Sequence, residues 1–196
     1  MDKNNLFGRA VAFAVDAHTG QLRKGTKLPY VLHPLEAATI CATMTDDEDV
    51  LAAAALHDTL EDTPTTKQTL EERFGSRVTE LVLAQTENKR KDQPASATWR
   101  TRKEESLEHL RTSDDHQAKM IYLSDKLSNI RSTARDMEHA GDHFWERFNQ
   151  SDPLQHAWYY LSVSEILEPD FADTPAWQEF HKTVHQVFDR YLQAET

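Results

Sequence analysis

The residues with the clearest capacity for chemistry form one short run, His57-Asp58-Thr59-Leu60-Glu61-Asp62. Residues four apart on a helix share a face, so His57 lies one turn from Glu61. Asp58 lies one turn from Asp62 for the same reason. Three carboxylates gathered in one patch cost free energy unless a cation compensates them. Imidazole and carboxylate together suit first-row divalent metals such as manganese, iron or zinc. The alternative is an acidic helix end that faces water, but such an end would oppose the helix macrodipole. The run therefore predicts a metal site.

Two other positions offer further ligands. His33 precedes Pro34 at an expected helix entry, where a turn can aim a side chain into a cleft. Asp125 interrupts the otherwise apolar helix MIYLSDKLSNIRS, and Asn129 follows it on the same face. Taken alone, His33 is more typical of a structural histidine than of a metal ligand, and an Asp–Asn pair is more typical of buried hydrogen bonding than of catalysis. Together with the run at 57–62, we interpret both His33 and Asp125 as candidate metal ligands.

Helical periodicity dominates the elements that must hold these residues in place. No alternation with a period of two persists beyond a few residues, and only five glycines occur. We therefore predict a single all-α domain over residues 1–196, whose C-terminal helices at 152–194 complete the bundle. The signals used are the apolar stripe Phe7, Val11, Ala14 and Val15; a short helix at 35–44; capping boxes at Thr45 with Glu48 and at Thr65 with Gln68; a stop near Gly75 and a restart at Ser76; helical stretches at 99–110 and 114–134; and N-caps at Asp152 and Thr174, each before a proline.

Composition narrows the class of protein. The chain has 196 residues, 38% apolar and 28% charged, which is typical of a globular protein with one sizeable core. A formal net charge of −11 opposes a broad nucleic-acid interface. No apolar run approaches the length of a membrane span, and the N-terminus lacks the pattern of a signal peptide. The single cysteine, Cys41, favours a reducing cytoplasm. Oligomeric state is left open.

Four stretches carry a family resemblance: AHTGQLRKGTKLPYVLHP, ALHDTLEDT, RFGSRVTELV and YLSDKLSNIRS. They resemble the HD-type hydrolase domain of RelA/SpoT-type proteins, and most of all the stand-alone small alarmone hydrolases and their animal homologues. The stretches occur in the family's order and lie within residues 10–135. The resemblance therefore implies that the expected helical bundle is a single HD domain.

The resemblance also implies roles for individual residues. It implies one bound Mn²⁺, held by His33, His57, Asp58 and Asp125. It implies that Glu61 and Asp62 activate or orient the attacking water, without deciding which is the general base. The expected substrate-binding residues are Arg23 and Lys24 on the phosphates, Tyr30 at the pocket, Asn129 on the nucleotide, and Tyr159. Tyr159 lies in a run of aromatics that resembles a nucleotide-stacking element, although aromatics at this spacing more often belong to a core.

The implied reaction removes the 3′-pyrophosphate of the small-molecule nucleotides ppGpp and pppGpp, which gives GDP or GTP. Two related alternatives are removal of the 2′-phosphate of NADPH and hydrolysis of adenine alarmones such as ppApp. An alternative of another class is a non-catalytic nucleotide-binding or antitoxin-like module, although all four ligands and both acids are present. Ser128 stands where family members often carry His or Tyr, which leaves base and sugar preference open.

One segment is locally basic. Between positions 87 and 103 only Glu87 and Asp92 are acidic. We expect either a solvated linker or a surface that helps to screen the leaving pyrophosphate. The basic residues are Lys89, Arg90, Lys91, Arg100, Arg102 and Lys103.

Overall fold

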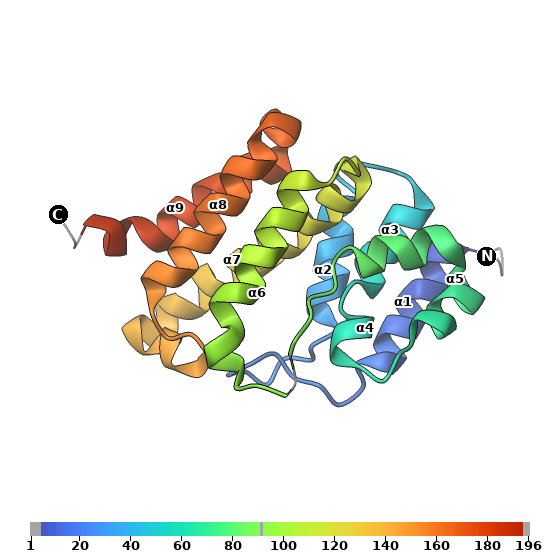
Figure 1. Cartoon of the computed structure of the whole chain (residues 1–196), viewed down its shortest axis with the longest axis horizontal. Helices are drawn as coiled ribbons and strands as arrows, with labels where there is room; N and C mark the ends of the chain where they lie inside the picture. The colour runs from blue at the N-terminus through green and yellow to red at the C-terminus, as the bar shows by residue number, and fades with distance from the viewer. Residues whose placement is uncertain (1–4, 91, 194–196) are drawn as a thin grey trace. The chain divides into compact units, whose positions relative to one another are not determined.

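The computed structural model describes residues 5–90 and 92–193, so Lys91 of the basic segment lies outside the described residues. Within these ranges the regular structure is helical, apart from an isolated antiparallel bridge between Leu22 and Pro29. The prediction of an all-α fold is confirmed. The helices are α1 (Leu6–Ala17), α2 (Leu32–Cys41), α3 (Glu48–Leu56), α4 (Thr59–Asp62), α5 (Lys67–Leu83), α6 (Ala95–Thr112), α7 (His116–Ala140), the 3₁₀ helix η1 (Gly141–Arg147), α8 (Pro153–Phe171) and α9 (Pro175–Leu192) (Figure 1).

The chain forms two compact units. The first comprises the residues up to Thr86 together with Asp115–Asp125, and the second comprises Glu87–Asp114 together with the residues from Lys126 onward. Helix α7 contributes its first part to one unit and its remainder to the other. Every predicted metal ligand belongs to the first unit.

The first unit is built around α3. This helix packs against α1, α2 and α5, and Ala52 through Leu56 are completely buried within it (Figure 1). Alanine side chains let neighbouring helices approach closely, and alanine also has the highest helix propensity. The alanine-rich sequence therefore gives a rigid central helix, and its C-terminal end carries His57 and Asp58.

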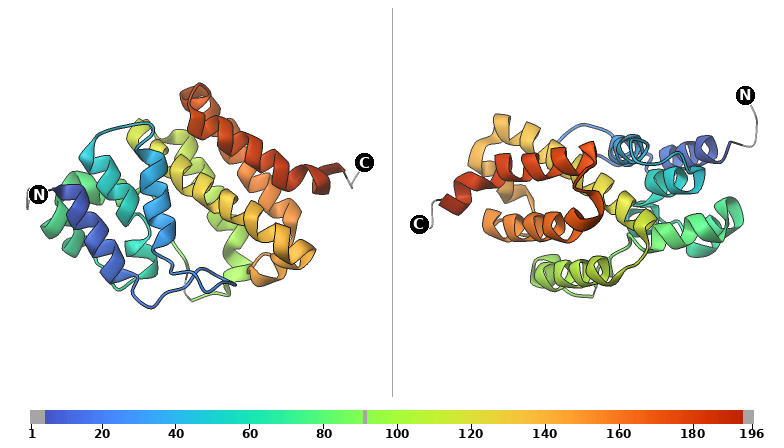
Figure 2. Two further views of the ribbon diagram at one scale, coloured as in Figure 1. Left: turned by 180° about the vertical axis from the view of Figure 1, so that it is seen from behind. Right: turned by 90° about the horizontal axis from the view of Figure 1, so that it is seen from above.

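The second unit pairs α8 with α9 and packs α6 against α8, and α8 and α9 lie side by side in both views of Figure 2. Its core is strongly aromatic, with large side chains that are almost completely buried: Phe144, Trp145, Phe171, Phe180 and Phe188. Aromatic side chains bury the largest apolar area per residue, which explains how a charged sequence stabilises this unit.

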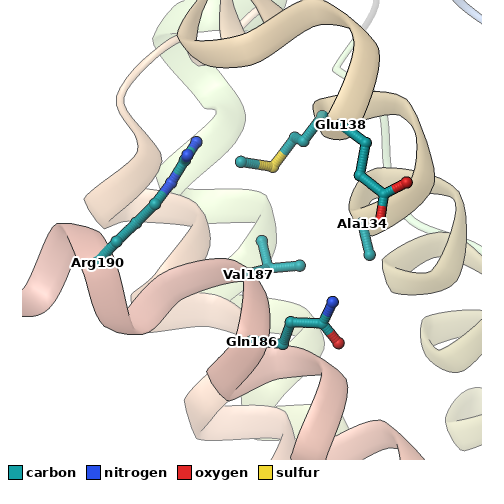
Figure 3. Close-up of a pocket in the computed structure, with 6 residues that line it drawn as sticks. Ala134, Glu138, Gln186, Val187 and Arg190 are labelled. Carbon is teal, nitrogen blue, oxygen red and sulfur yellow. The ribbon is translucent and has the colours of Figure 1, made fainter.

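A pocket of about 170 Å³ lies between α7 and α9 in the second unit (Figure 3). None of the predicted site residues lines it. Its lining residues are Ala134, Met137, Glu138, Gln186, Val187 and Arg190.

Several predicted helix boundaries are confirmed. Asp152 caps α8 by accepting a hydrogen bond of 2.9 Å from the Leu154 N–H, and Thr174 caps α9. The predicted stop at Gly75 and restart after it are confirmed, because Gly75 has non-helical backbone angles (φ of 87° and ψ of 171°) and divides α5 into two helical parts across a kink. Two predicted N-caps lie later in the sequence than expected. Asp47 rather than Thr45 caps α3, and Thr66 rather than Thr65 caps α5.

No helix in the described part of the chain combines the length and the apolar character that a bilayer span requires.

Candidate metal centre

The four predicted metal ligands converge in the first unit from three places in the fold. His33 lies in the first turn of α2, which begins at Leu32 and therefore earlier than the predicted residue 35. His57 and Asp58 occupy the junction between α3 and α4, and Asp125 comes from α7. His33, His57 and Asp125 are buried, and Asp58 is partly buried.

The junction between α3 and α4 differs from the continuous helix that we expected through His57 and Asp58. Helix α3 ends at Leu56, and the Thr59 hydroxyl donates a hydrogen bond of 2.7 Å to the Leu56 carbonyl. This side-chain bond competes with the next turn of backbone hydrogen bonding. Asp58 nevertheless keeps its one-turn relation to Asp62, whose N–H donates to the Asp58 carbonyl at 2.9 Å.

The ligand atoms are close enough to share one cation. His33 Nε2 lies 3.4 Å from Asp58 Oδ2 and 3.1 Å from Asp125 Oδ1. His57 Nε2 lies 3.2 Å from the same Asp58 oxygen and 3.7 Å from the same Asp125 oxygen. Ligand atoms of His33, His57 and Asp58 all lie within 4.8 Å of one another. Two imidazole nitrogens and two carboxylate oxygens therefore surround one small volume and could hold a metal ion.

The orientation of His57 fits a metal ligand. Its Nδ1 lies 2.8 Å from the Ala54 carbonyl oxygen, which can only accept, so Nδ1 carries the proton and Nε2 the lone pair. His57 Nε2 is buried and forms no well-directed hydrogen bond within the described residues. An unsatisfied buried nitrogen aimed at two carboxylates is costly unless a cation completes the site.

The charges in the cluster reinforce that fit. Burial lowers the pKa of the His33 imidazole, which favours its neutral, metal-binding form. Burial opposes protonation of His57 too, but the Asp58 charge and the contacts of Nε2 with Asp125 and Asp58 raise its pKa well above the ordinary value. The pKa of Asp58 lies below its usual range, because the positive charge of His57 and its contact with the Asp58 carboxylate outweigh burial. Without metal, a proton on His57 thus supplies the positive charge that a cation would otherwise provide.

Tyr30 joins the metal cluster to the predicted acid Asp62. Its hydroxyl donates to Asp58 Oδ2 at 2.7 Å and approaches Asp62 Oδ2 at 3.1 Å. Burial, followed by the charges of Asp58 and Asp62, raises the Tyr30 pKa well above its ordinary value of 10.0. Tyr30 therefore remains a neutral phenol and a hydrogen-bond donor. Its ring also lies 6.0 Å, centre to centre, from that of His33.

The loop between α1 and α2 holds Tyr30 in place. Its two arms form a narrow hairpin, in which the Tyr30 N–H donates to the Gln21 carbonyl at 2.9 Å and the Arg23 N–H donates to the Leu28 carbonyl at 2.9 Å. The Gln21 side chain reaches α4, and its Nε2 donates to the Asp62 backbone oxygen at 2.7 Å. Buried His18 supports Gln21 through a contact of 2.8 Å between Nδ1 and Oε1.

The sequence pattern does not single out His18 or Gln21 as functional residues. Both lie in the stretch AHTGQLRKGTKLPYVLHP, but nothing in their spacing indicates a contact with Asp62. That His18 is buried and Gln21 half-buried depends on the folded hairpin, so only the structure shows it.

The remaining predicted residues lie in both units. Arg23 places its guanidinium carbon 5.7 Å from the centre of the Tyr30 ring, Lys24 is exposed on the same loop, and Glu61 is half-buried in α4. Asn129 and Tyr159 belong to the second unit. Asn129 lies one turn beyond Asp125 along α7, as the spacing predicted.

Tyr159 is buried in the second unit, and cations lie over its ring. The Nζ atoms of Lys103 and Lys126 lie 4.8 Å and 5.8 Å from the ring centre. The Trp99 ring lies 6.3 Å from the Tyr159 ring, centre to centre. Tyr159 therefore combines core packing with a locally cationic environment.

The basic segment is more nearly neutral in the structure than in the sequence. Glu87 accepts from Lys103 at 2.6 Å and from Arg102 at 3.0 Å. Glu104 and Glu105, just beyond the segment, pair with Arg100 and Arg90 respectively. Four of the predicted cations are thus held by carboxylates, which reduces the positive charge that the segment can offer to an anion.

Comparisons with known proteins agree with this geometry. A zebrafish (Danio rerio) relative named guanosine-3′,5′-bis(diphosphate) 3′-pyrophosphohydrolase MESH1 is 38% identical over 128 residues, which cover 64% of this chain and 67% of the relative. An Aquifex aeolicus relative named guanosine-3′,5′-bis(diphosphate) 3′-pyrophosphohydrolase is 39% identical over 126 residues, 63% of this chain. That match spans only 17% of the longer Aquifex protein.

A solved structure described as a metazoan ortholog of SpoT that hydrolyses ppGpp has a TM-score of 0.73 and 25% identity to this chain. The match covers 95% of this chain and 97% of the other. A second structure, from Listeria monocytogenes EGD-e, has a TM-score of 0.67 and 29% identity, and covers 80% of this chain and 94% of that one. The family model described as HD domain matches residues 10–147, which include all four clustered ligands. The chain therefore belongs to the HD domain family.

Proposed function

We propose that the chain hydrolyses the 3′-pyrophosphate of ppGpp and pppGpp, which gives GDP or GTP and pyrophosphate. One observation carries the proposal: His57 Nε2 is buried without a well-directed hydrogen bond and faces the carboxylates of Asp58 and Asp125. The relatives named for this reaction support the choice of substrate. In this proposal His33, His57, Asp58 and Asp125 bind one Mn²⁺, and the two compact units work as one domain over residues 1–196.

The proposed mechanism assigns a task to each group. A divalent ion held by His33, His57, Asp58 and Asp125 would supply Lewis acidity at the attacking water and at a phosphoryl oxygen. Asp62 or Glu61 accepts the proton of the attacking water and orients that water toward phosphorus. Arg23 and Lys24 bind the phosphates and offset the negative charge that develops on the pyrophosphate.

Substrate preference rests on residues outside the ligand cluster. We propose that Tyr159 and Asn129 contribute to nucleotide binding, with Lys103 and Lys126 beside the Tyr159 ring supplying positive charge. Cys41 is a buried free thiol, which supports the proposal of a reducing cytoplasm.

A substrate panel tests the function. Purified protein with Mn²⁺ is given ppGpp, ppApp and NADPH separately, and pyrophosphate and orthophosphate are measured independently. Pyrophosphate from ppGpp is the expected result, and it should disappear in Asp58→Asn and Asp125→Asn. Orthophosphate from NADPH alone would instead assign the chain to 2′-phosphate removal. Tight nucleotide binding with no product from any substrate would contradict an enzymatic function.

A further inference from the structure

We propose that Tyr30 and Gln21 are positioning residues, which hold the acid Asp62 at a fixed place beside the metal ligand Asp58. This inference deepens the proposed function and rests on it where it concerns turnover. Its effect on metal binding is independent of the substrate.

The Tyr30 hydroxyl is a hydrogen-bond donor that contacts two carboxylates. Asp58 Oδ2 and Asp62 Oδ2 lie 2.7 Å and 3.1 Å from the same hydroxyl. Two nearby carboxylates repel one another, and a neutral donor between them offsets that repulsion.

Asp62 is contacted at both its side chain and its backbone. Tyr30 contacts its carboxylate, while Gln21 Nε2 donates to its backbone oxygen at 2.7 Å. Helix α4 has only four residues, so its own hydrogen bonds define the position of its last residue weakly. The hairpin supplies the missing support from outside the helix.

Tyr30 and Gln21 are also joined to one another. The Tyr30 N–H donates to the Gln21 carbonyl at 2.9 Å, which fixes the spacing of the two residues. His18 is 2% exposed and contacts both, through its Nδ1 to Gln21 Oε1 at 2.8 Å and by its ring to that of Tyr30 at 5.0 Å. Polar groups packed around a site in this way fix the rotamers of the groups they contact.

The arrangement also distinguishes the two acids, which the sequence treats alike. Asp62, the last residue of α4, shares a hydroxyl with a metal ligand, and this relation places its carboxylate beside the cluster. We therefore assign the water-orienting role to Asp62, with Tyr30 and Gln21 acting through it.

The test compares Tyr30→Phe with Gln21→Leu. Mn²⁺ affinity is measured by calorimetry without nucleotide, and kcat and KM are measured with ppGpp. Tyr30→Phe should weaken Mn²⁺ binding about tenfold and lower kcat about tenfold to 100-fold, with KM within about twofold of wild type. Gln21→Leu should lower kcat but leave Mn²⁺ affinity unchanged, because Gln21 contacts Asp62 and no metal ligand.

A matched control removes another tyrosine hydroxyl. Tyr191 accepts a hydrogen bond of 2.9 Å from Trp145 Nε1 in the second unit, and Tyr191→Phe should retain wild-type Mn²⁺ affinity and kcat. Melting temperatures are recorded for all variants. Wild-type Mn²⁺ affinity and kcat in Tyr30→Phe would overturn the inference. The same holds if this variant shows only a lower melting temperature, with Mn²⁺ affinity and kcat unchanged. If wild type does not cleave ppGpp, the proposed function fails, while the Mn²⁺ titration still tests the hold on Asp58.

Discussion

His57 Nδ1 lies 2.8 Å from the backbone oxygen of Ala54, one turn earlier in the chain. This contact fixes the imidazole tautomer before any ligand arrives, since a carbonyl oxygen cannot donate. Nε2, which carries the lone pair when His57 is neutral, therefore faces Asp58 and Asp125. A backbone partner cannot be removed by a side-chain substitution at Ala54, so this orientation is a property of the end of α3 itself.

Mn²⁺ should stabilise the folded chain. A ligand that binds only the native state adds about 2.7 kcal/mol at 100 times its dissociation constant. We expect the melting temperature to rise on addition of Mn²⁺ and to return to its starting value with excess EDTA. Asp58→Asn should abolish the rise, because it removes an anionic ligand. An equal rise in this variant would mean that the ion binds elsewhere.

Glu87→Gln should destabilise the protein although the change is nearly isosteric. The Glu87 side chain is 14% exposed and accepts from both Lys103 and Arg102. Burial alone would raise the Glu87 pKa, but Lys103 and the other nearby cations lower it. Neutralising the carboxylate leaves two partly buried cations without their counter-ion, which costs about 3 kcal/mol.

The control for Glu87 is Glu104→Gln. Glu104 pairs with Arg100 at 2.8 Å, but both side chains are about half exposed, at 53% and 44%. An exposed pair contributes about 0.3–0.5 kcal/mol. The free energies of unfolding measured in urea should therefore differ clearly between the two variants. Equal losses of stability would contradict the buried role of Glu87.

The sequence predicts those parts of the site that depend on local spacing. His57, Asp58 and Asp62 lie within one short run, and their helical relation is visible before folding. The motifs that resemble the hydrolase family add His33 and Asp125. The interruption after Leu56 escapes the same reasoning, because it depends on whether the Thr59 hydroxyl bonds to the Leu56 carbonyl.

Contacts between distant segments are the part that the sequence does not predict. Tyr30 and Asp62 are 32 residues apart, and their contact depends on how the hairpin folds onto α4. The same holds for Glu87, which accepts a hydrogen bond from Lys103 because α6 runs back past the loop that precedes it. The pair between Arg100 and Glu104 is the opposite case, since a spacing of four on a helix indicates it directly.

His156 should make the folded state less stable in acid. Burial lowers its pKa, and its Nε2–H donates to the Gln150 carbonyl at 2.8 Å. The folded-state pKa lies below that of the unfolded chain, which is about 6.5. As pH falls through that value, the unfolded state binds a proton that the folded state does not, and stability is lost.

The measurement is the urea midpoint at about pH 7.5 and about pH 5.5 with EDTA present, chosen to bracket the ordinary histidine pKa. Wild type should lose more stability between these values than His156→Gln, which keeps an amide donor at the position of the ring. Identical pH dependence in the two proteins would mean that His156 has the same pKa in the folded and unfolded states.

Gly75→Ala should destabilise the protein through its backbone alone. Gly75 has φ of 87° and ψ of 171° inside α5, and a Cβ placed there would meet no atom within 4 Å. These angles are accessible almost only to glycine, so the expected cost is about 1–3 kcal/mol. Gly141 also has open space but a milder φ of 57°, and Gly141→Ala should cost about 1 kcal/mol. Chemical unfolding of both variants checks the order. If Gly75→Ala were the milder change, α5 would have to straighten by adopting helical angles at residue 75, because no side-chain clash distinguishes the two sites.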